Sequence, residues 1–403
     1  MLQTNMPYKT TSSRQQLKRE LDPILHNGTC LDNENLAPGI VFGVTNDKET
    51  VYLNHSGYLN IETKDPVTND SKFAMLSATK PISSLAMLQL VDRNLVDLDT
   101  PVEKYLPKFA SVTILTKDAN GNKVFSKPKN KATLRQLLTH TAGFAYSFTN
   151  EDYLQTLVST GQPNLFDSNS STFDATYLTF EPGTDWSYGM GLDWAGLVLE
   201  EVTGLSLGEY IRVNILEPAK MNNTTFKLSK TEKDLMLIHV RGETGMNVFD
   251  LQYPRESQID MAGHGLFGTV DDYLKFIRIW LNKGKTDDGV QLLSEKLWEV
   301  AVQSNLPKGT EMKNLDAYQA NLCGPVSFPP DSSWTLGFCR NGTDFHTGRK
   351  SGSLWWCGVA NCYLWVDLKT KIGGFYATQV FPYGDPSRET YYGLEEAVYN
   401  NLN

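Results

Sequence analysis

The stretch that decides the fold of this 403-residue chain is Phe73-Ala74-Met75-Leu76-Ser77-Ala78-Thr79-Lys80-Pro81-Ile82. An apolar run leads to a serine, a lysine follows three residues later, and apolar residues then recur at helical spacing as far as Val91. Pro81 is tolerated in the first turn of a helix, where its missing N–H would have no partner anyway. The pattern therefore predicts a helix that begins at Ser77 and carries Lys80 on the same face one turn later.

A serine and a lysine at this spacing can act as a nucleophile and its base. A serine hydroxyl is a poor nucleophile until a base takes its proton, and a partly buried lysine with a lowered pKa can be that base. The N–H groups at the helix start would face whatever Ser77 attacks. The tetrapeptide alone is weak evidence, because it also describes a helix-capping serine followed by a solvated lysine.

Composition and charge argue against several classes of partner. The chain is 40% hydrophobic and 21% charged, with a net charge of −9 and no basic block, which argues against nucleic acid and anionic membrane surfaces. No apolar run approaches the length of a membrane span, and residues 1–14 are polar. The five cysteines are odd in number and lack paired metal spacing. We expect a cytoplasmic protein with reduced thiols and with no metal or cofactor.

The order of the predicted elements indicates one sheet formed from both chain ends and interrupted by a large helical insertion. Strand-like runs lie near both ends of the chain, at 38–44, 51–58, 353–356, 362–366 and 373–378. The polar stretch 305–345 predicts a long surface loop. We expect two domains, a discontinuous α/β domain of residues 1–80 and 290–403 and a mainly helical domain of residues 81–289. Ser77 would lie at their junction, where clefts form.

A second serine must be weighed as the nucleophile. Gly204-Leu205-Ser206-Leu207-Gly208 matches the G-x-S-x-G elbow of α/β-hydrolases, which requires a strand before the serine. Here a helical pattern precedes Ser206, and Ser206 with Glu209 reads as a capping box. We therefore assign Ser206 to a helix cap.

Two further motifs contain side chains that are candidates for an active site. The stretch Trp186–Gly191 presents Tyr188 either as a packed aromatic turn or as a phenol that faces a cleft and transfers protons. Lys350-Ser351-Gly352 and the aromatic run that follows it read either as a basic turn into a strand or as a strand edge lining an active site.

Taken in order, these segments resemble the landmarks of the serine β-lactamase-like superfamily. The landmarks are 77–80, 133–143, Tyr188, 263–276 and 350–352, and the resemblance covers about residues 36–379. The closest branches are class C β-lactamases, D,D-carboxypeptidases, family VIII carboxylesterases and fungal lovastatin-type acyltransferases. The resemblance implies an α+β, β-lactamase/transpeptidase-like fold, with an antiparallel sheet formed from both chain ends, flanked by helices and interrupted by a large helical insertion.

The resemblance also implies catalytic roles. Ser77 matches the acylated nucleophile, Lys80 matches the lysine that helps to deprotonate it, and Tyr188 matches the tyrosine that exchanges protons with nucleophile, leaving group and water. We expect the ammonium of Lys80 to lower the pKa of Tyr188, so that the two groups titrate as a coupled pair.

The third family motif is ambiguous in this chain. Lys350-Ser351-Gly352 resembles Lys-Thr-Gly, whereas Trp356-Cys357-Gly358 resembles the Trp-Gly-Gly of esterases. The residues expected at the oxyanion and substrate site are Gly358, Val359, Lys350 and Trp356. Met190 replaces the asparagine of the Tyr-x-Asn motif, and both departures favour esters over lactams.

The sequence thus predicts a serine hydrolase that forms an acyl-enzyme on Ser77 and hydrolyses a small-molecule ester or thioester. An acyltransferase that passes the acyl group to an alcohol is the first alternative. A β-lactamase or D,D-peptidase is a further alternative, and an inactive binding protein of the same fold is the alternative outside enzymes.

Overall fold

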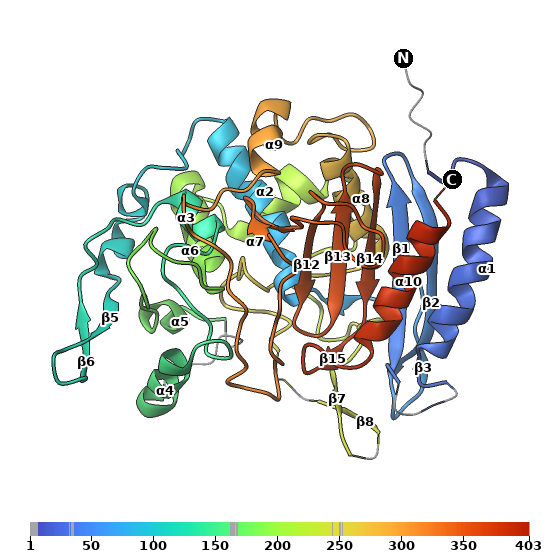
Figure 1. The fold of residues 1–403 in the computed structure, drawn as a ribbon, viewed down its shortest axis with the longest axis horizontal. Helices are drawn as coiled ribbons and strands as arrows, with labels where there is room; N and C mark the ends of the chain where they lie inside the picture. Colours follow the sequence, from blue (N-terminus) through green and yellow to red (C-terminus); the bar gives the residue numbers. More distant parts are fainter. Residues whose placement is uncertain are drawn as a thin grey trace.

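The computed structural model describes residues 7–31, 33, 36–161, 166, 168–243, 245–249, 251 and 253–402. Its centre is an antiparallel sheet of eight strands in the order β10-β11-β12-β13-β14-β1-β2-β3 (Figure 1). The long strands are β1 (Gly39–Asn46), β2 (Thr50–Asn60), β12 (Leu354–Gly358), β13 (Cys362–Asp367) and β14 (Ile372–Ala377), and the short ones are β3 (Asp65–Pro66), β10 (Ser333–Trp334) and β11 (Cys339–Arg340).

The two ends of the chain meet within this sheet. β1 pairs with β14 from Val41 opposite Ala377 to Asn46 opposite Ile372. Every residue of β1 is buried, because helices cover both faces of the sheet at this point. The expected α+β fold with a sheet formed from both chain ends is confirmed.

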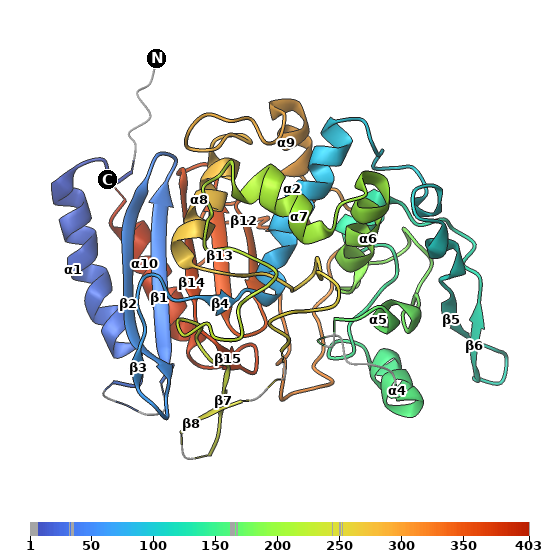
Figure 2. The same cartoon turned by 180° about the vertical axis from the view of Figure 1, so that it is seen from behind.

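Three helices cover the sheet. α1 (Thr11–Asn27) and α10 (Arg388–Asn400) pack against each other, and Figures 1 and 2 show α10 on one face of the sheet and α8 (Val270–Leu281) on the other. α8 packs against β1 and β14. The division into residues 1–80 with 290–403 and residues 81–289 stays a prediction, and α8 does not follow it, because this helix lies in the second range but packs on the sheet.

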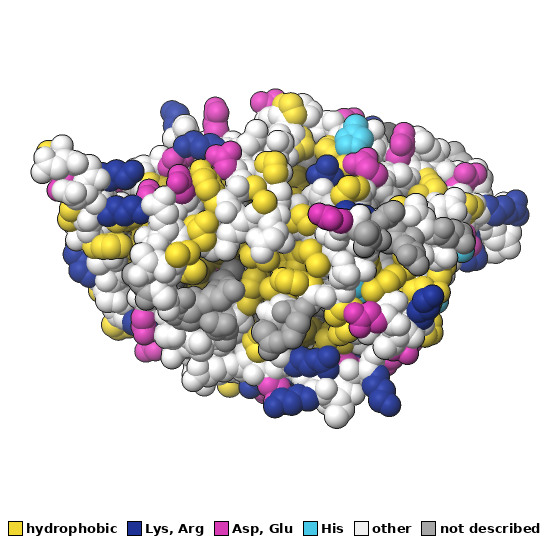
Figure 3. All heavy atoms as spheres, turned by 90° about the horizontal axis from the view of Figure 1, so that it is seen from below, with side chains coloured by type: hydrophobic (Ala, Val, Ile, Leu, Met, Phe, Trp, Pro, Cys, Tyr) yellow, Lys and Arg dark blue, Asp and Glu magenta, His cyan; other side chains and the backbone are white. Residues whose placement is uncertain are grey.

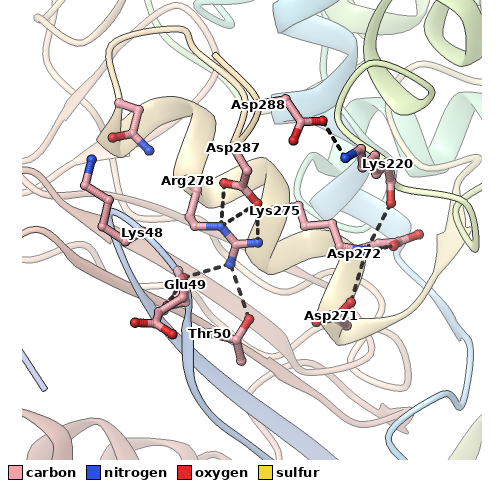
Figure 4. A network of polar contacts seen from close by, with 12 residues as sticks. Lys48, Glu49, Thr50, Lys220, Asp271, Asp272, Lys275, Arg278, Asp287 and Asp288 are labelled. Carbon is pink, nitrogen blue, oxygen red and sulfur yellow. Dashed lines mark hydrogen bonds and ion pairs between the residues drawn. The ribbon is translucent and has the colours of Figure 1, made fainter. Parts of the chain in front are cut away.

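A buried arginine fastens α8 to the sheet. Arg278 Nη1 donates to Thr45 Oγ1 at 2.9 Å and to Thr50 Oγ1 at 3.3 Å, on β1 and β2 (Figure 4). Its Nε and Nη2 donate to Asp287 at 2.8 and 2.7 Å. A guanidinium that donates two hydrogen bonds to one carboxylate forms a strong, charge-assisted pair, and the bonds of its Nη1 to the two threonines fix the end of α8 against the strands.

The remaining helices lie beside the sheet around α2 (Thr79–Asp92), which contacts α6 (Gly191–Thr203) and α7 (Leu207–Ile211). The apolar stripe expected on α2 is only part of its buried surface, since all residues from Thr79 to Leu90 are buried. A helix buried on all sides has neighbours all round it. The other helices are α3 (Leu134–Leu138), α4 (Glu151–Thr160), α5 (Ser171–Asp174) and α9 (Glu295–Ala301).

Several short strands depart from the sequence expectations. β5 (Ile114–Lys117) and β6 (Lys123–Ser126) form a hairpin in a region expected to be mostly helical, and β10 and β11 lie within the expected loop 305–345. Strands of two to four residues carry too little alternation to be recognised in a sequence. The others are β4 (Phe73–Ala74), β7 (His239–Arg241), β8 (Met246–Val248), β9 (Phe267–Gly268) and β15 (Val380–Phe381).

The surface mixes charges of both signs. Seen from below, hydrophobic side chains gather in the middle of the molecule, and Lys and Arg alternate with Asp and Glu around them (Figure 3). Among the described residues, no helix has the length and hydrophobicity that crossing a membrane requires.

Candidate active site

Ser77 lies in a turn between a short strand and the central helix. β4 pairs with β9, and the 3-10 turn Leu76–Ala78 then leads into α2, so the helix begins two residues later than the sequence predicted. Leu76 has a φ of 47°, which is a strained value for a leucine. The turn presents Ser77 beside the first residues of α2.

Lys80 lies within reach of the serine and is enclosed by protein. Its Nζ is 3.1 Å from Ser77 Oγ and donates to the carbonyl oxygen of Gly263 at 2.8 Å. The rings of Tyr146 and Tyr188 lie 5.1 and 4.8 Å from the ammonium nitrogen. Lys80 is 1% exposed, and this burial lowers its pKa from 10.5 to about 7. At neutral pH a large fraction of Lys80 is therefore the free amine, which can accept a proton.

Tyr188 is the second group at the serine. Its hydroxyl donates to Ser77 Oγ at 2.7 Å and accepts the indole N–H of Trp356 at 3.2 Å. Burial raises the pKa of Tyr188 well above 10, so the expectation that the ammonium of Lys80 would lower this pKa is wrong. Desolvation of the phenolate outweighs the attraction of the cation. Tyr188 is therefore a phenol that donates a proton toward Ser77.

The end of β12 closes the other side of the serine. Trp356 and Gly358 belong to β12, and Val359 follows it. A methyl group placed on Gly358 would lie 2.6 Å from the carbonyl oxygen of Met75, so the strand and the turn before Ser77 approach each other closely at this glycine. The structure thus brings Trp356, Gly358 and Val359 to the side of Ser77, and their part in an oxyanion and substrate site stays a prediction.

Lys350 is the site candidate that the structure places elsewhere. It lies eight residues before Gly358, beyond the opposite end of β12, and its ammonium pairs with Asp344 at 3.1 Å. Strand residues advance about 3.3 Å each, so the two ends of this segment are too far apart to meet at one serine. The structure therefore does not join Lys350 to Ser77, and Trp356-Cys357-Gly358 is the third-motif segment that reaches it.

One cavity lies beside Ser77, and a second one shares lining residues with it. A narrow one of about 30 Å³ is lined by Ser77, Tyr188 and Trp356 and by apolar side chains such as Phe148 and Leu315. A wider one of about 550 Å³ lies between residues 325–330, residues 343–346 and the start of α10. Val326 and Tyr383 line both, so the two cavities are neighbours.

Ser206 caps a helix, as the sequence indicated. Its hydroxyl accepts the N–H of Glu209 at 3.2 Å at the start of α7, and α6 precedes it in the chain. The carboxylate of Glu209 bonds to Arg212. Ser206 therefore lacks the strand that a nucleophile elbow requires.

Some contacts of Lys80 carried little signal in the sequence. Gly263 lies within the loop 263–276 that carried the family resemblance, but nothing in the sequence indicated that its carbonyl would bind Lys80. Tyr146 belongs to no motif and reaches Lys80 only through the fold. Within the described ranges, no three or more His, Cys, Asp or Glu side chains are arranged to hold a metal ion.

Comparison with known proteins shows which proteins the chain is similar to. The Beta-lactamase family model matches residues 29–398. Lovastatin esterase of Penicillium rubens is 32% identical over 331 residues, which is 78% of this chain and 81% of the esterase. Monacolin J acid methylbutanoyltransferase of Aspergillus terreus is 29% identical over 350 residues, 83% of each chain.

The same fold occurs in a solved relative. Simvastatin synthase of Aspergillus terreus superposes with a TM-score of 0.77 over 97% of this chain and 98% of the synthase, at 24% identity. The resemblance inferred from the sequence motifs is thereby confirmed. These two relatives found by sequence are an esterase and an acyltransferase, so an ester hydrolase or acyltransferase is the class of enzyme that fits the chain. The chain belongs to the Beta-lactamase family.

Proposed function

We propose that the chain is a serine carboxylesterase whose nucleophile is Ser77, whose base is Lys80 and whose proton donor is Tyr188. One observation carries the proposal: Lys80 Nζ and Tyr188 Oη lie 3.1 and 2.7 Å from the same serine oxygen. Among the described residues, the hydrogen-bond partners of that lysine nitrogen are Ser77 Oγ and the carbonyl oxygen of Gly263, and neither is a carboxylate. A lysine buried in this way is available as a base near neutral pH.

The acylation step follows from these contacts. Ser77 Oγ forms a bond to the ester carbonyl carbon while its proton passes to the amine of Lys80. The oxyanion faces backbone N–H groups of Ser77 and Val359. The bond to the alkoxy group then breaks, the alkoxy oxygen takes the phenolic proton of Tyr188, and Lys80 returns its proton to the phenolate. An alcohol leaves and an acyl-enzyme remains.

Deacylation uses the same groups. Water gives a proton to Lys80 as its oxygen bonds to the acyl carbon. The bond to Ser77 breaks, Ser77 takes the proton of Tyr188, and Lys80 restores that proton. A carboxylic acid leaves and the starting protonation states return.

Acyl transfer is the second candidate function, and it differs only in the group that attacks the acyl-enzyme. The methylbutanoyltransferase relative favours it, as does the wide cavity, which shares two lining residues with the cavity at the serine and has the volume to hold an alcohol. A β-lactamase is less well supported, because buried Met190 stands where that activity uses an asparagine.

The substrate in this proposal is a small-molecule ester or thioester, and the protein works in the cytoplasm without a cofactor. The location is supported by the buried cysteines at 323, 339, 357 and 362, which are thiols in the structure.

The test compares two serine variants. Ser77→Ala is expected to abolish p-nitrophenyl butyrate hydrolysis and labelling by a fluorophosphonate, with a loss of about 10⁴-fold or more. Ser206→Ala is the matched control and should keep both while losing about 1 kcal/mol of stability with its helix cap. An added alcohol that forms a new ester, followed by chromatography, identifies acyl transfer. Labelling of Ser206 in the wild-type protein would contradict the proposal.

A further inference from the structure

A buried carboxylate lies behind the Lys80 and Gly263 contact. Asp193 is on the first turn of α6, five residues after Tyr188, and is 2% exposed. Its Oδ1 accepts the N–H of Gly263 at 2.8 Å, while the carbonyl oxygen of the same glycine accepts Lys80 Nζ at 2.8 Å. A single residue therefore connects the carboxylate to the lysine.

Residue 263 has no room for a side chain because of this carboxylate. A methyl group on Gly263 would lie 2.7 Å from Asp193 Oδ2 and 3.0 Å from the hydroxyl of Tyr146. The second carboxylate oxygen is buried and has no hydrogen-bond partner among the described residues. Burying an ionised carboxylate whose oxygen lacks a hydrogen-bond partner costs free energy unless a positive charge nearby compensates it.

Lys80 is that charge. Burial raises the pKa of Asp193 to about 6, and the cation of Lys80 opposes the rise. The carboxylate in turn acts on Lys80, where it partly offsets the effect of burial on the lysine pKa. No direct ion pair forms between them, so the coupling acts through space and through Gly263.

The other ionisable groups around the pair hold one charge state near neutral pH. Burial holds the pKa of His140 well below 6.5 and lowers that of His264 to about 3. Burial raises the pKa of the Cys357 thiol to about 12. It also raises the pKa values of the phenols nearby, which are Tyr146, Tyr188 and Tyr253. Among these groups, Asp193 and Lys80 are the two that change charge near pH 7.

We propose that Asp193 is a positioning residue for the reaction at Ser77. Its carboxylate holds Gly263 so that the glycine carbonyl orients Lys80, and its negative charge sets the pH above which Lys80 becomes a free base. The proposal rests on the proposed function of Lys80 and extends it to a residue that touches neither Ser77 nor the substrate.

Asp193→Asn tests the charge while it keeps the shape and an oxygen for the Gly263 N–H. The measurement is kcat/KM for p-nitrophenyl butyrate and the rate of fluorophosphonate labelling from about pH 5 to about pH 9. With the carboxylate gone, the ammonium of Lys80 is less favoured, so the acid limb of both profiles should move to lower pH by about one unit or more. A purely structural role would lower the rate without moving the limb.

Asp260→Asn is the matched control. Asp260 is also a buried carboxylate that accepts the N–H of a glycine, Gly208, at 3.1 Å, and a methyl group on Gly208 would lie 2.6 Å from it. Its replacement should cost stability and leave the acid limb in place.

An active Asp193→Asn enzyme with an acid limb that coincides with the wild-type limb overturns the proposal. If that variant does not fold, Asp193→Ser serves instead, because it also removes the negative charge and keeps a side-chain oxygen near the Gly263 N–H, and a moved or unmoved acid limb again decides. The two proposals fail separately. A wild-type protein in which Ser77 is never labelled removes the proposed function, whereas an active enzyme with an unmoved limb removes only the role of Asp193.

Discussion

Two buried cations, Lys80 on α2 and Arg278 on α8, show how burial has opposite consequences in one fold. Lys80 is 1% exposed and Arg278 is 4% exposed. Arg278 donates to both oxygens of Asp287 and to two threonine hydroxyls (Figure 4). Lys80 contacts a serine oxygen and a neutral carbonyl oxygen.

The difference lies in what each environment does to the charge. A guanidinium keeps its proton in proteins and is stabilised by its carboxylate, so Arg278 joins elements together. An ammonium that is buried without an ion pair releases its proton more readily, and burial lowers the pKa of Lys80 to about 7. Arg278, which has a carboxylate ion pair, stabilises the fold, and Lys80, which has no direct ion pair, is available for proton transfer.

The largest expected effect is that of Lys80→Met. This change removes the proposed base, and kcat/KM for p-nitrophenyl butyrate should fall by about 10⁴-fold or more. Stability should hold or rise below about pH 10. The pKa of Lys80 is about 7 in the folded protein, against an ordinary value of 10.5. The free-energy cost of burying this lysine is therefore complete below pH 7 and disappears as pH rises toward 10.5. Thermal melts at several pH values measure this. A variant that keeps a tenth of the activity would contradict the role of Lys80.

Tyr188→Phe should have the next largest effect. The ring and its packing against His140 and Trp356 remain, whereas the hydroxyl that donates to Ser77 is lost. Loss of a general acid costs roughly 10²–10⁴-fold, and kcat should fall within that range. Steady-state kinetics with a melting curve separates this from a packing defect. A variant with near-normal kcat would leave Lys80 as the single proton carrier.

The smallest expected effect on chemistry is that of Arg278→Met. The variant leaves Asp287 and two threonine hydroxyls without their donor, and Asp287 is partly solvated, so the free energy of unfolding should fall by about 1–3 kcal/mol. Activity per folded molecule should stay at the wild-type value. Urea unfolding and active-site titration measure the two quantities. A large loss of kcat in the folded variant would contradict a purely structural role for Arg278.

The sequence was sufficient for the parts of the fold that have long, regular patterns. Strands at both chain ends, the helix after Ser77 and the capping role of Ser206 are all recognisable in this way. The hairpin of β5 and β6 and the edge strands β10 and β11 were missed, because two to four residues carry no clear period. The packing of α8 on the sheet was also missed, because a helical pattern in the sequence does not show which element the helix packs against.

Short sequence motifs predicted part of the site, and the rest depends on the folded structure. Ser77, Lys80 and Tyr188 belong to short motifs, and the structure brings them together. Lys350 also belongs to a motif, but the length of β12 separates it from the serine. The pKa of Tyr188 depends on how completely the phenol is enclosed, and the contacts of Lys80 with Gly263 and Tyr146 join segments far apart in the chain. Enclosure and long-range contacts arise only in the folded chain.

The most direct test of the central claim is the pH dependence of the rate at which a fluorophosphonate labels the wild-type protein, with the labelled residue identified by mass spectrometry. We predict a label on Ser77 and a labelling rate that rises through an apparent pKa of about 7 as Lys80 becomes the free amine. A label on another residue, or a rate on Ser77 that does not change through neutral pH, would contradict it.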